Sequence, residues 1–157
     1  MKNVLTIPFP HNTIACMENA HNQNILLYSE KIIEFLRSRL DIIAIYLYGS
    51  ILNKNFNNES DIDIAVITEN RTDPVKLYDI AADLSVILKR DIHLVDFVST
   101  TDVLRIEILK NKNVIFCHDD EKRLYYEMIA LTSYQKLNEE REMAIRTIYG
   151  DNVWNSL

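Results

Sequence analysis

Glycine, proline and cysteine are scarce in this sequence. Its 157 residues include two glycines, three prolines and two cysteines. Because Cys16 and Cys117 lie far apart, we expect neither a disulfide framework nor a cysteine-rich zinc site. No apolar run approaches membrane-spanning length, and no signal-peptide pattern opens the chain. These absences predict a cytoplasmic protein that makes no membrane contact.

Positive charge is also in short supply. The 17 Lys and Arg residues are outnumbered by 23 Asp and Glu residues, which gives a formal net charge of −6. A protein that binds DNA or RNA directly normally presents a basic face, so we expect no direct nucleic-acid ligand. An acidic surface suits a basic protein partner, or a domain that is merely well solvated.

The length of the chain predicts one domain with a substantial hydrophobic core. Pro8 and Pro10 interrupt any helix near the start, and the residues that follow them show weak periodicity. We therefore expect an irregular arm over residues 1–20 and a single domain over residues 21–157.

Hydrophobic periodicity predicts alternating helices and strands in the rest of the chain. Helices are expected over residues 24–40, 74–89 and 120–149, with a short helix ending near residue 110, and strands over residues 42–48, 61–68, 91–97 and 113–117. Asp73 is a candidate N-cap with Pro74 at the first helical position, and Ser99 or Thr100 is a candidate cap for the short helix.

The last predicted helix carries two apolar stripes. One consists of Leu124, Met128 and Leu131; the other consists of Ala130, Tyr134, Leu137, Ala144 and Ile148. One face can pack on the sheet while the other binds a partner, or both faces can be covered within the domain. The sequence does not decide between these alternatives.

Chemistry is indicated around Gly49, one of the two glycines, which directly follows the β-rich run 42–48. A glycine here favours a tight turn whose backbone amides approach a ligand closely. Asp61 and Asp63 are two residues apart in a predicted strand, so both carboxylates point to one face, where they repel unless a cation lies between them. The pattern favours a divalent metal site beside a phosphate-binding turn; the alternative is a hairpin with a solvated acidic edge.

Gly49-Ser50, ten intervening residues and Asp61-x-Asp63 resemble the signature of the DNA polymerase β-like nucleotidyltransferase superfamily. The segment from Ser133 to Arg141 is similar to the MNT-type antitoxins of HEPN/MNT toxin–antitoxin modules, and the likeness spans roughly residues 25 to 148. The resemblance implies an α+β fold, in which helices flank a small mixed β-sheet and a long C-terminal helix follows.

The resemblance also implies an activity. ATP would lie with its phosphates against Gly49 and Ser50, and Asp61 and Asp63 would hold Mg²⁺. AMP would pass from ATP to a tyrosine of a HEPN ribonuclease toxin, which silences the toxin. Such a protein would also bind the toxin, and a homo- or hetero-oligomer is compatible with the sequence.

Two positions depart from the family pattern. Where a third carboxylate is usual on the next strand, alignment places His93, with Asp91 on the same face and Asp96 on the opposite face. A neutral imidazole can act as a base but is a poor Mg²⁺ ligand, so the site is slow, recruits Asp91 through a strand irregularity, or is inactive. Where the family has a basic residue and a glycine, the chain has Lys54, which either contacts the triphosphate or is a solvated loop lysine.

The candidate catalytic residues are therefore Ser50, Asp61, Asp63 and His93, and the candidate nucleotide-binding residues are Gly49, Ser50 and Lys54. Two other functions fit the sequence. One is a catalytically degenerate antitoxin that acts by binding alone, and the other is a nucleotidyltransferase for a small molecule, of the aminoglycoside type. Nucleic-acid polymerisation is disfavoured by the acidic charge.

Overall fold

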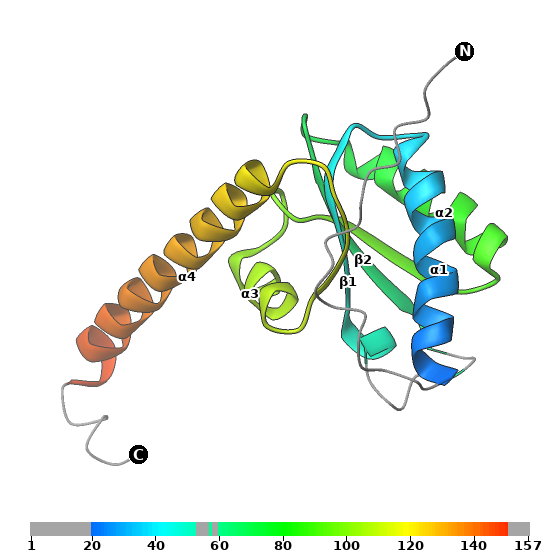
Figure 1. The fold of residues 1–157 in the computed structure, drawn as a ribbon. Coiled ribbons are helices and arrows are strands. Elements are labelled where there is room, and N and C mark those ends of the chain that lie inside the picture. Colours follow the sequence, from blue (N-terminus) through cyan, green and yellow to red (C-terminus); the bar gives the residue numbers. More distant parts are fainter. Residues whose placement is uncertain (1–19, 53–56, 58–59, 151–157) are drawn as a thin grey trace.

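The computed structural model describes residues 20–52, 57 and 60–150 (Figure 1). Its elements are α1 (Ala20–Arg37), β1 (Ile42–Tyr48), the 3-10 turn η1 (Gly49–Leu52), β2 (Ile62–Thr68), α2 (Pro74–Leu88), β3 (Ile92–Asp96), α3 (Asp102–Lys110), β4 (Asn113–Cys117) and α4 (Asp120–Tyr149). The predicted α+β class, with a mixed sheet and a long C-terminal helix, is confirmed.

The sheet has the strand order β3-β2-β1-β4. β1 is antiparallel to both β2 and β4, whereas β2 and β3 are parallel. This pairing sets Tyr48 opposite Asp63, and Asp63 opposite His93. Three residues far apart in sequence are thereby aligned across neighbouring strands, at the end of the sheet where β1 runs into η1.

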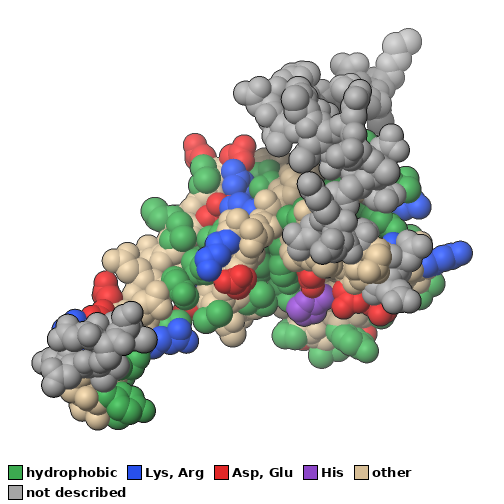
Figure 2. Space-filling view, turned by 90° about the horizontal axis from the view of Figure 1, so that it is seen from below, with side chains coloured by type: hydrophobic (Ala, Val, Ile, Leu, Met, Phe, Trp, Pro, Cys, Tyr) green, Lys and Arg blue, Asp and Glu red, His purple; other side chains and the backbone are tan. Residues whose placement is uncertain are grey.

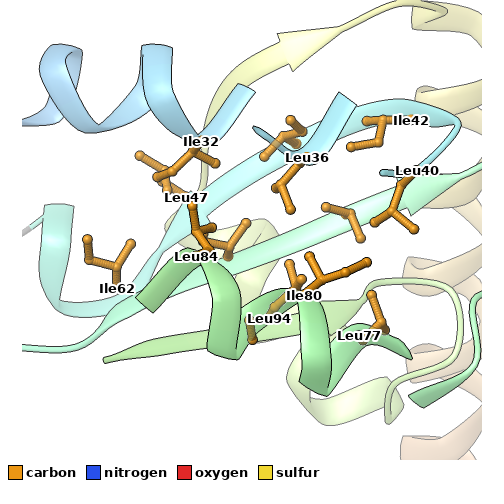
Figure 3. Close-up of a cluster of buried hydrophobic side chains, with 14 of the residues drawn as sticks. Ile32, Leu36, Leu40, Ile42, Leu47, Ile62, Leu77, Ile80, Leu84 and Leu94 are labelled. Carbon is orange, nitrogen blue, oxygen red and sulfur yellow. The ribbon is translucent and has the colours of Figure 1, made fainter. Parts of the chain in front are cut away.

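Helices cover both faces of the sheet (Figure 1). On one face, Ile32 and Leu36 of α1 and Leu77 and Leu84 of α2 pack against the sheet in one core (Figure 3). On the other face, a smaller core includes one buried residue of α3 and one of α4. β1 lies between the two cores with all seven residues buried, which explains why its sequence is apolar without alternation.

The helix ends follow from local chemistry. The Asp73 carboxylate accepts a hydrogen bond from the Val75 amide at 2.8 Å, as its predicted N-cap role requires. The predicted cap of α3 was wrong, because the cap is Thr101, whose side chain accepts from the Leu104 amide. Ser99 instead donates its hydroxyl hydrogen bond to Asp96 in the preceding turn at 2.7 Å, so the helix begins later than predicted.

Two predicted boundaries also shift. α1 begins at Ala20 and ends at Arg37, whereas the periodicity predicted a helix over residues 24–40. A tight turn closes the helix, in which the Leu40 amide donates to the Leu36 carbonyl at 2.9 Å. Leu40 continues the apolar stripe into this turn and is buried, and for that reason it reads as helical in the sequence.

Only the first part of α4 packs on the domain. Ala130 is buried and Tyr134 is half-buried, whereas Ala144 and Ile148 of the same predicted stripe are exposed. At 30 residues the helix is about 45 Å long, and its second half projects away from the sheet (Figure 1) with hydrophobic and charged side chains along it (Figure 2).

The other predicted stripe of α4 is exposed. Leu124, Met128 and Leu131 each keep more than half of their surface accessible in the part of the chain that the structure describes. The sequence left open whether the domain covers both faces of this helix. The described part of the domain leaves this face uncovered.

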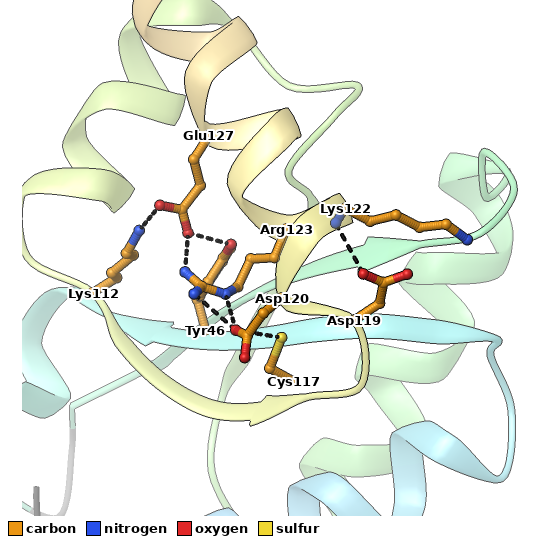
Figure 4. Close-up of polar contacts among 8 residues, drawn as sticks. All are labelled: Tyr46, Lys112, Cys117, Asp119, Asp120, Lys122, Arg123 and Glu127. Atoms are coloured by element: carbon orange, nitrogen blue, oxygen red, sulfur yellow. Dashed lines mark hydrogen bonds and ion pairs between the residues drawn. The ribbon is translucent and has the colours of Figure 1, made fainter. Parts of the chain in front are cut away.

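A polar network fixes the start of α4 to the sheet (Figure 4). The buried Tyr46 hydroxyl of β1 donates to Glu127 at 2.8 Å, and Glu127 also pairs with Arg123 and Lys112. Burial alone would raise the pKa of the Glu127 carboxyl, but the hydrogen bonds from Lys112 and Tyr46 and the positive charge of Lys112 lower it instead. The charged carboxylate of Glu127 on α4 therefore bonds to β1 through Tyr46 and to the residue directly before β4, Lys112.

Candidate functional site

The turn after β1 is built on Gly49. Its φ is +72°, in the left-handed region, and a Cβ placed there would overlap the Asp63 Oδ2 atom of β2. Both features require glycine, since any other residue brings strain and a collision. The predicted tight turn at Gly49 is confirmed, and the group that lies against the glycine is the carboxylate of Asp63; the approach of the backbone amides to a ligand stays a prediction.

Ser50 links this turn to the beginning of β2. Its hydroxyl donates to the Asp61 carbonyl oxygen at 3.1 Å. The structure therefore joins the two halves of the Gly49-Ser50…Asp61-x-Asp63 pattern directly. In this conformation the Ser50 hydroxyl bonds to the backbone of the residue before β2. The turn itself, η1, lies where β1 ends and β2 begins.

Asp63 lies at the centre of the site. Its Oδ1 atom is 3.3 Å from His93 Nδ1, and the Asp63 side chain is 24% exposed whereas that of His93 is 61% exposed. Burial raises the pKa of the Asp63 carboxyl, the nearby Asp61 charge raises it further, and the hydrogen bond and charge of His93 act in the opposite direction. Asp61 and His93, two of the predicted site residues, are therefore close enough to Asp63 to interact with it electrostatically.

Tyr48 is a member of this cluster that sequence reasoning missed. It lies opposite Asp63 in the antiparallel pair. Its hydroxyl is buried and has no hydrogen-bond partner among the described residues. Burial and the charge of Asp63 raise its pKa to about 12. The signal available in the sequence was its place directly before Gly49, but only strand register brings it to Asp63.

The carboxylates suit a hard cation that arrives with phosphate. Among the residues that the structure describes, no group of three or more His, Cys, Asp or Glu side chains forms a ready metal site. Mg²⁺ is commonly held by only one or two carboxylates, with water and substrate phosphates as further ligands. Asp61 and Asp63 can supply such a pair, and the absence of a Cβ at Gly49 leaves room for the Asp63 carboxylate.

Two other acidic candidates flank His93, namely Asp91 directly before β3 and Asp96 at the end of that strand. Asp96 is buried and accepts hydrogen bonds from the Val98 amide and the Ser99 hydroxyl, so it stabilises the turn after the strand. Asp91 is exposed, and its backbone carbonyl accepts from the Ile62 amide. His93 is the β3 residue that contacts Asp63.

Arg90 holds the segment that leads into Asp61. Its Nη1 atom donates to the Asn57 carbonyl at 2.7 Å and lies 3.5 Å from the Ser60 carbonyl, and its Nε atom donates to the Tyr28 hydroxyl at 3.3 Å. No motif marked Arg90 in the sequence, because its partners are 30 or more residues away. The predicted nucleotide-binding Lys54 lies outside the described residues.

No described helix has the length and apolar character needed to cross a bilayer.

Comparison with known proteins places these features in context. The family model for polymerase β, nucleotidyltransferase matches residues 30–121. The protein adenylyltransferase MntA of Shewanella oneidensis is 30% identical over 128 residues, which cover 81% of this chain and 91% of MntA.

Solved structures agree with this relationship. A chain of a toxin–antitoxin crystal structure with AMP-PNP matches with a TM-score of 0.69 and 29% identity, over 76% of this chain and 97% of that chain. A chain in the structure of a tri-AMPylated Shewanella oneidensis HEPN toxin in complex with MNT antitoxin matches with a TM-score of 0.66 and 28% identity, over 78% and 97% of the two chains.

Proposed function

Since the chain belongs to the polymerase β nucleotidyltransferase family, we propose that it is an antitoxin that transfers AMP from ATP to a tyrosine of a cognate HEPN ribonuclease toxin. The similar protein MntA is a protein adenylyltransferase, and a similar chain is found with a tri-AMPylated HEPN toxin. The observation that carries the proposal is the close approach of the Gly49 turn to Asp63. Asp63 lies in β2, and Asp61 directly precedes that strand.

The proposed nucleotide site uses both halves of the motif. Backbone amides of the Gly49-Ser50 turn would donate to the phosphates, and Lys54 would add positive charge near the triphosphate. Asp61 and Asp63 would hold Mg²⁺, which when bound neutralises charge on the phosphates. The Ser50 hydroxyl, which donates to the Asp61 carbonyl, would keep the turn and the carboxylates in fixed relation.

His93 is the proposed base. Its exposed ring leaves it accessible to an acceptor that enters from solvent, while its Nδ1 atom lies 3.3 Å from Asp63 Oδ1. The phenol oxygen of the toxin tyrosine would attack the α-phosphorus of ATP, the bond to pyrophosphate would break, and His93 would take the phenolic proton.

The toxin also needs a docking surface on this chain. We assign it to the exposed stripe of α4, Leu124, Met128 and Leu131, because none of the residues that the structure describes covers this face. Because the proposed transfer uses ATP, we expect the antitoxin and its toxin to act in the cytoplasm.

A labelling experiment tests the transfer. The chain is incubated with ATP labelled at the α-phosphate, Mg²⁺ and the HEPN ribonuclease encoded beside it, and label on the ribonuclease is measured. Asp61→Asn with Asp63→Asn should abolish labelling. Asp79→Asn with Asp83→Asn removes the same charge from exposed positions of α2 and should leave labelling unchanged. A ribonuclease that stays unlabelled with the wild-type chain contradicts the proposal.

A second candidate function is neutralisation by binding alone. It is favoured by the histidine at the usual third carboxylate position, since imidazole is a poor ligand for Mg²⁺. In that case the Asp61→Asn, Asp63→Asn variant still protects cells from the toxin, whereas Leu131→Asp on α4 does not. If protection is lost in both variants, catalysis is required and binding alone is insufficient.

A further inference from the structure

A second concavity lies at the opposite end of the sheet from the Gly49 turn. It is a cavity of about 420 Å³, formed where α1 ends, β1 begins, β2 ends and α2 begins. Figure 1 shows these segment ends at the top of the domain and the η1 turn at the bottom. The seven residues of β1 separate the two places by about 20 Å, so the cavity is distinct from the proposed nucleotide site.

The cavity wall is basic although the chain is acidic. Arg37, Arg39, Arg71 and Lys76 line it, with Asp41 and Asp73 as the acidic residues. This excess of cations contrasts with the net charge of −6 for the whole chain. The Asp73 carboxylate is moreover engaged as the N-cap of α2, which leaves it less able to pair with the basic side chains.

Within the described ranges, most of these cations have no carboxylate partner. Arg39 pairs with Asp83 at 3.3 Å, but no ion pair among the described residues involves Arg37, Arg71 or Lys76. The guanidinium carbon of Arg37 lies 4.7 Å from the centre of a phenylalanine ring, a contact that uses its flat face and leaves its N–H edge for other partners.

Lys76 adds positive charge near the start of α2. It is the third residue of the helix, whose first turn contains no acidic residue, although the Asp73 carboxylate at the N-cap offsets part of the partial positive charge of the helix N-terminus. An anion bound in the cavity would accept hydrogen bonds from Lys76 and from the guanidinium groups.

We propose that this cavity binds an oligophosphate chain. Its volume is in the range of small-ligand sites, and arginine forks beside a helix N-terminus match phosphate oxygens. None of the described residues that line the cavity is aromatic, so its wall offers no ring on which a nucleobase could stack. The phosphate chain is therefore the recognised group, whether free or as the tail of a nucleoside triphosphate.

The test is a titration of the full ¹⁵N-labelled chain, followed residue by residue through amide chemical shifts. Tripolyphosphate is added without Mg²⁺, and ATP and AMP are used in parallel. We expect saturating shifts at Asn70 and Thr72 with tripolyphosphate and ATP, and none with AMP. Shifts at these residues with ATP but not tripolyphosphate would overturn recognition of the phosphate chain, as would shifts confined to Gly49 and Ser50.

Variants distinguish a built site from general attraction. Arg71→Gln with Lys76→Gln removes two charged donors, and we expect at least about tenfold weaker tripolyphosphate binding. Lys110→Gln with Lys136→Gln changes the net charge equally at exposed positions of α3 and α4 and should leave binding unchanged. Equal weakening in both double variants, with the spectra of folded protein retained, would overturn the proposal.

Discussion

The two glycines form a natural pair of experiments on the proposed site. Both have positive φ, +72° at Gly49 and +78° at Gly150. A methyl group at Gly49 would overlap Asp63 Oδ2 and lie 3.1 Å from Asp63 Cγ, whereas one at Gly150 meets nothing within 4 Å. Gly49→Ala and Gly150→Ala therefore share backbone strain, and only the first displaces the carboxylate.

The expected magnitudes differ accordingly. Each alanine in the left-handed region costs about 1–2 kcal/mol, and at Gly150 this cost is confined to the exposed end of α4. At Gly49 the Asp63 side chain must also move away, which changes its 3.3 Å contact with His93. A displacement of about 1 Å in a reacting geometry reduces the rate on the order of 100-fold, so we expect that loss for Gly49→Ala alone.

The assay is kcat/KM for transfer of labelled AMP to the toxin, measured beside urea unfolding to verify that each variant is folded. Gly150→Ala should be within about twofold of wild type, and Gly49→Ala about 100-fold slower. A folded Gly49→Ala protein that transfers AMP within about threefold of the wild-type rate would refute the argument, because it would mean that the position of the Asp63 carboxylate does not limit the reaction.

Three further substitutions test other parts of the molecule. Arg90→Gln removes the donor to the Asn57 carbonyl, and we expect about tenfold lower kcat/KM with unfolding free energy nearly unchanged. His93→Asp supplies a third carboxylate and should increase the labelling rate at limiting Mg²⁺; an unchanged Mg²⁺ dependence would place His93 outside the site. Glu127→Gln breaks the network of Figure 4 and should lower the free energy of unfolding by about 3 kcal/mol at neutral pH. Because the folded-state pKa of Glu127 is below its ordinary 4.5, this contribution is complete above that pH and disappears as pH falls through the lowered pKa, so the urea-unfolding energies of wild type and variant should converge as the buffer is made more acidic than that pKa.

Local signals in the sequence were sufficient for most of the fold. Asp73 caps α2 as expected, and the apolar run of β1 is buried throughout, because caps and burial patterns depend on neighbouring residues. Ser99 shows the limit of such signals, since several hydroxyls precede α3 and the one that caps it depends on the turn made by Asp96. A choice among equivalent caps needs the three-dimensional structure.

In the candidate site, too, some residues could be predicted from local sequence and others could not. The approach of Gly49 and Asp63 was foreseeable because both belong to a short motif with flanking strands. Tyr48 and Arg90 were not, since Tyr48 reaches Asp63 through strand register and Arg90 reaches its loop across the end of α2. The position of His93 came from a family pattern, and the parallel pairing of β2 and β3 now gives it a direct neighbour in Asp63.

A histidine at this position changes how the site would acquire its metal. Asp61 already raises the pKa of the partly buried Asp63, and a third carboxylate would add to that repulsion whenever no cation is present. With His93 the repulsion is smaller, but one oxygen ligand is lost and imidazole is a poor substitute for Mg²⁺. The missing oxygens must then come from the nucleotide phosphates. We therefore expect Mg²⁺ to bind weakly alone and tightly with ATP, so that AMP transfer follows the concentration of the Mg²⁺–ATP complex rather than that of free Mg²⁺.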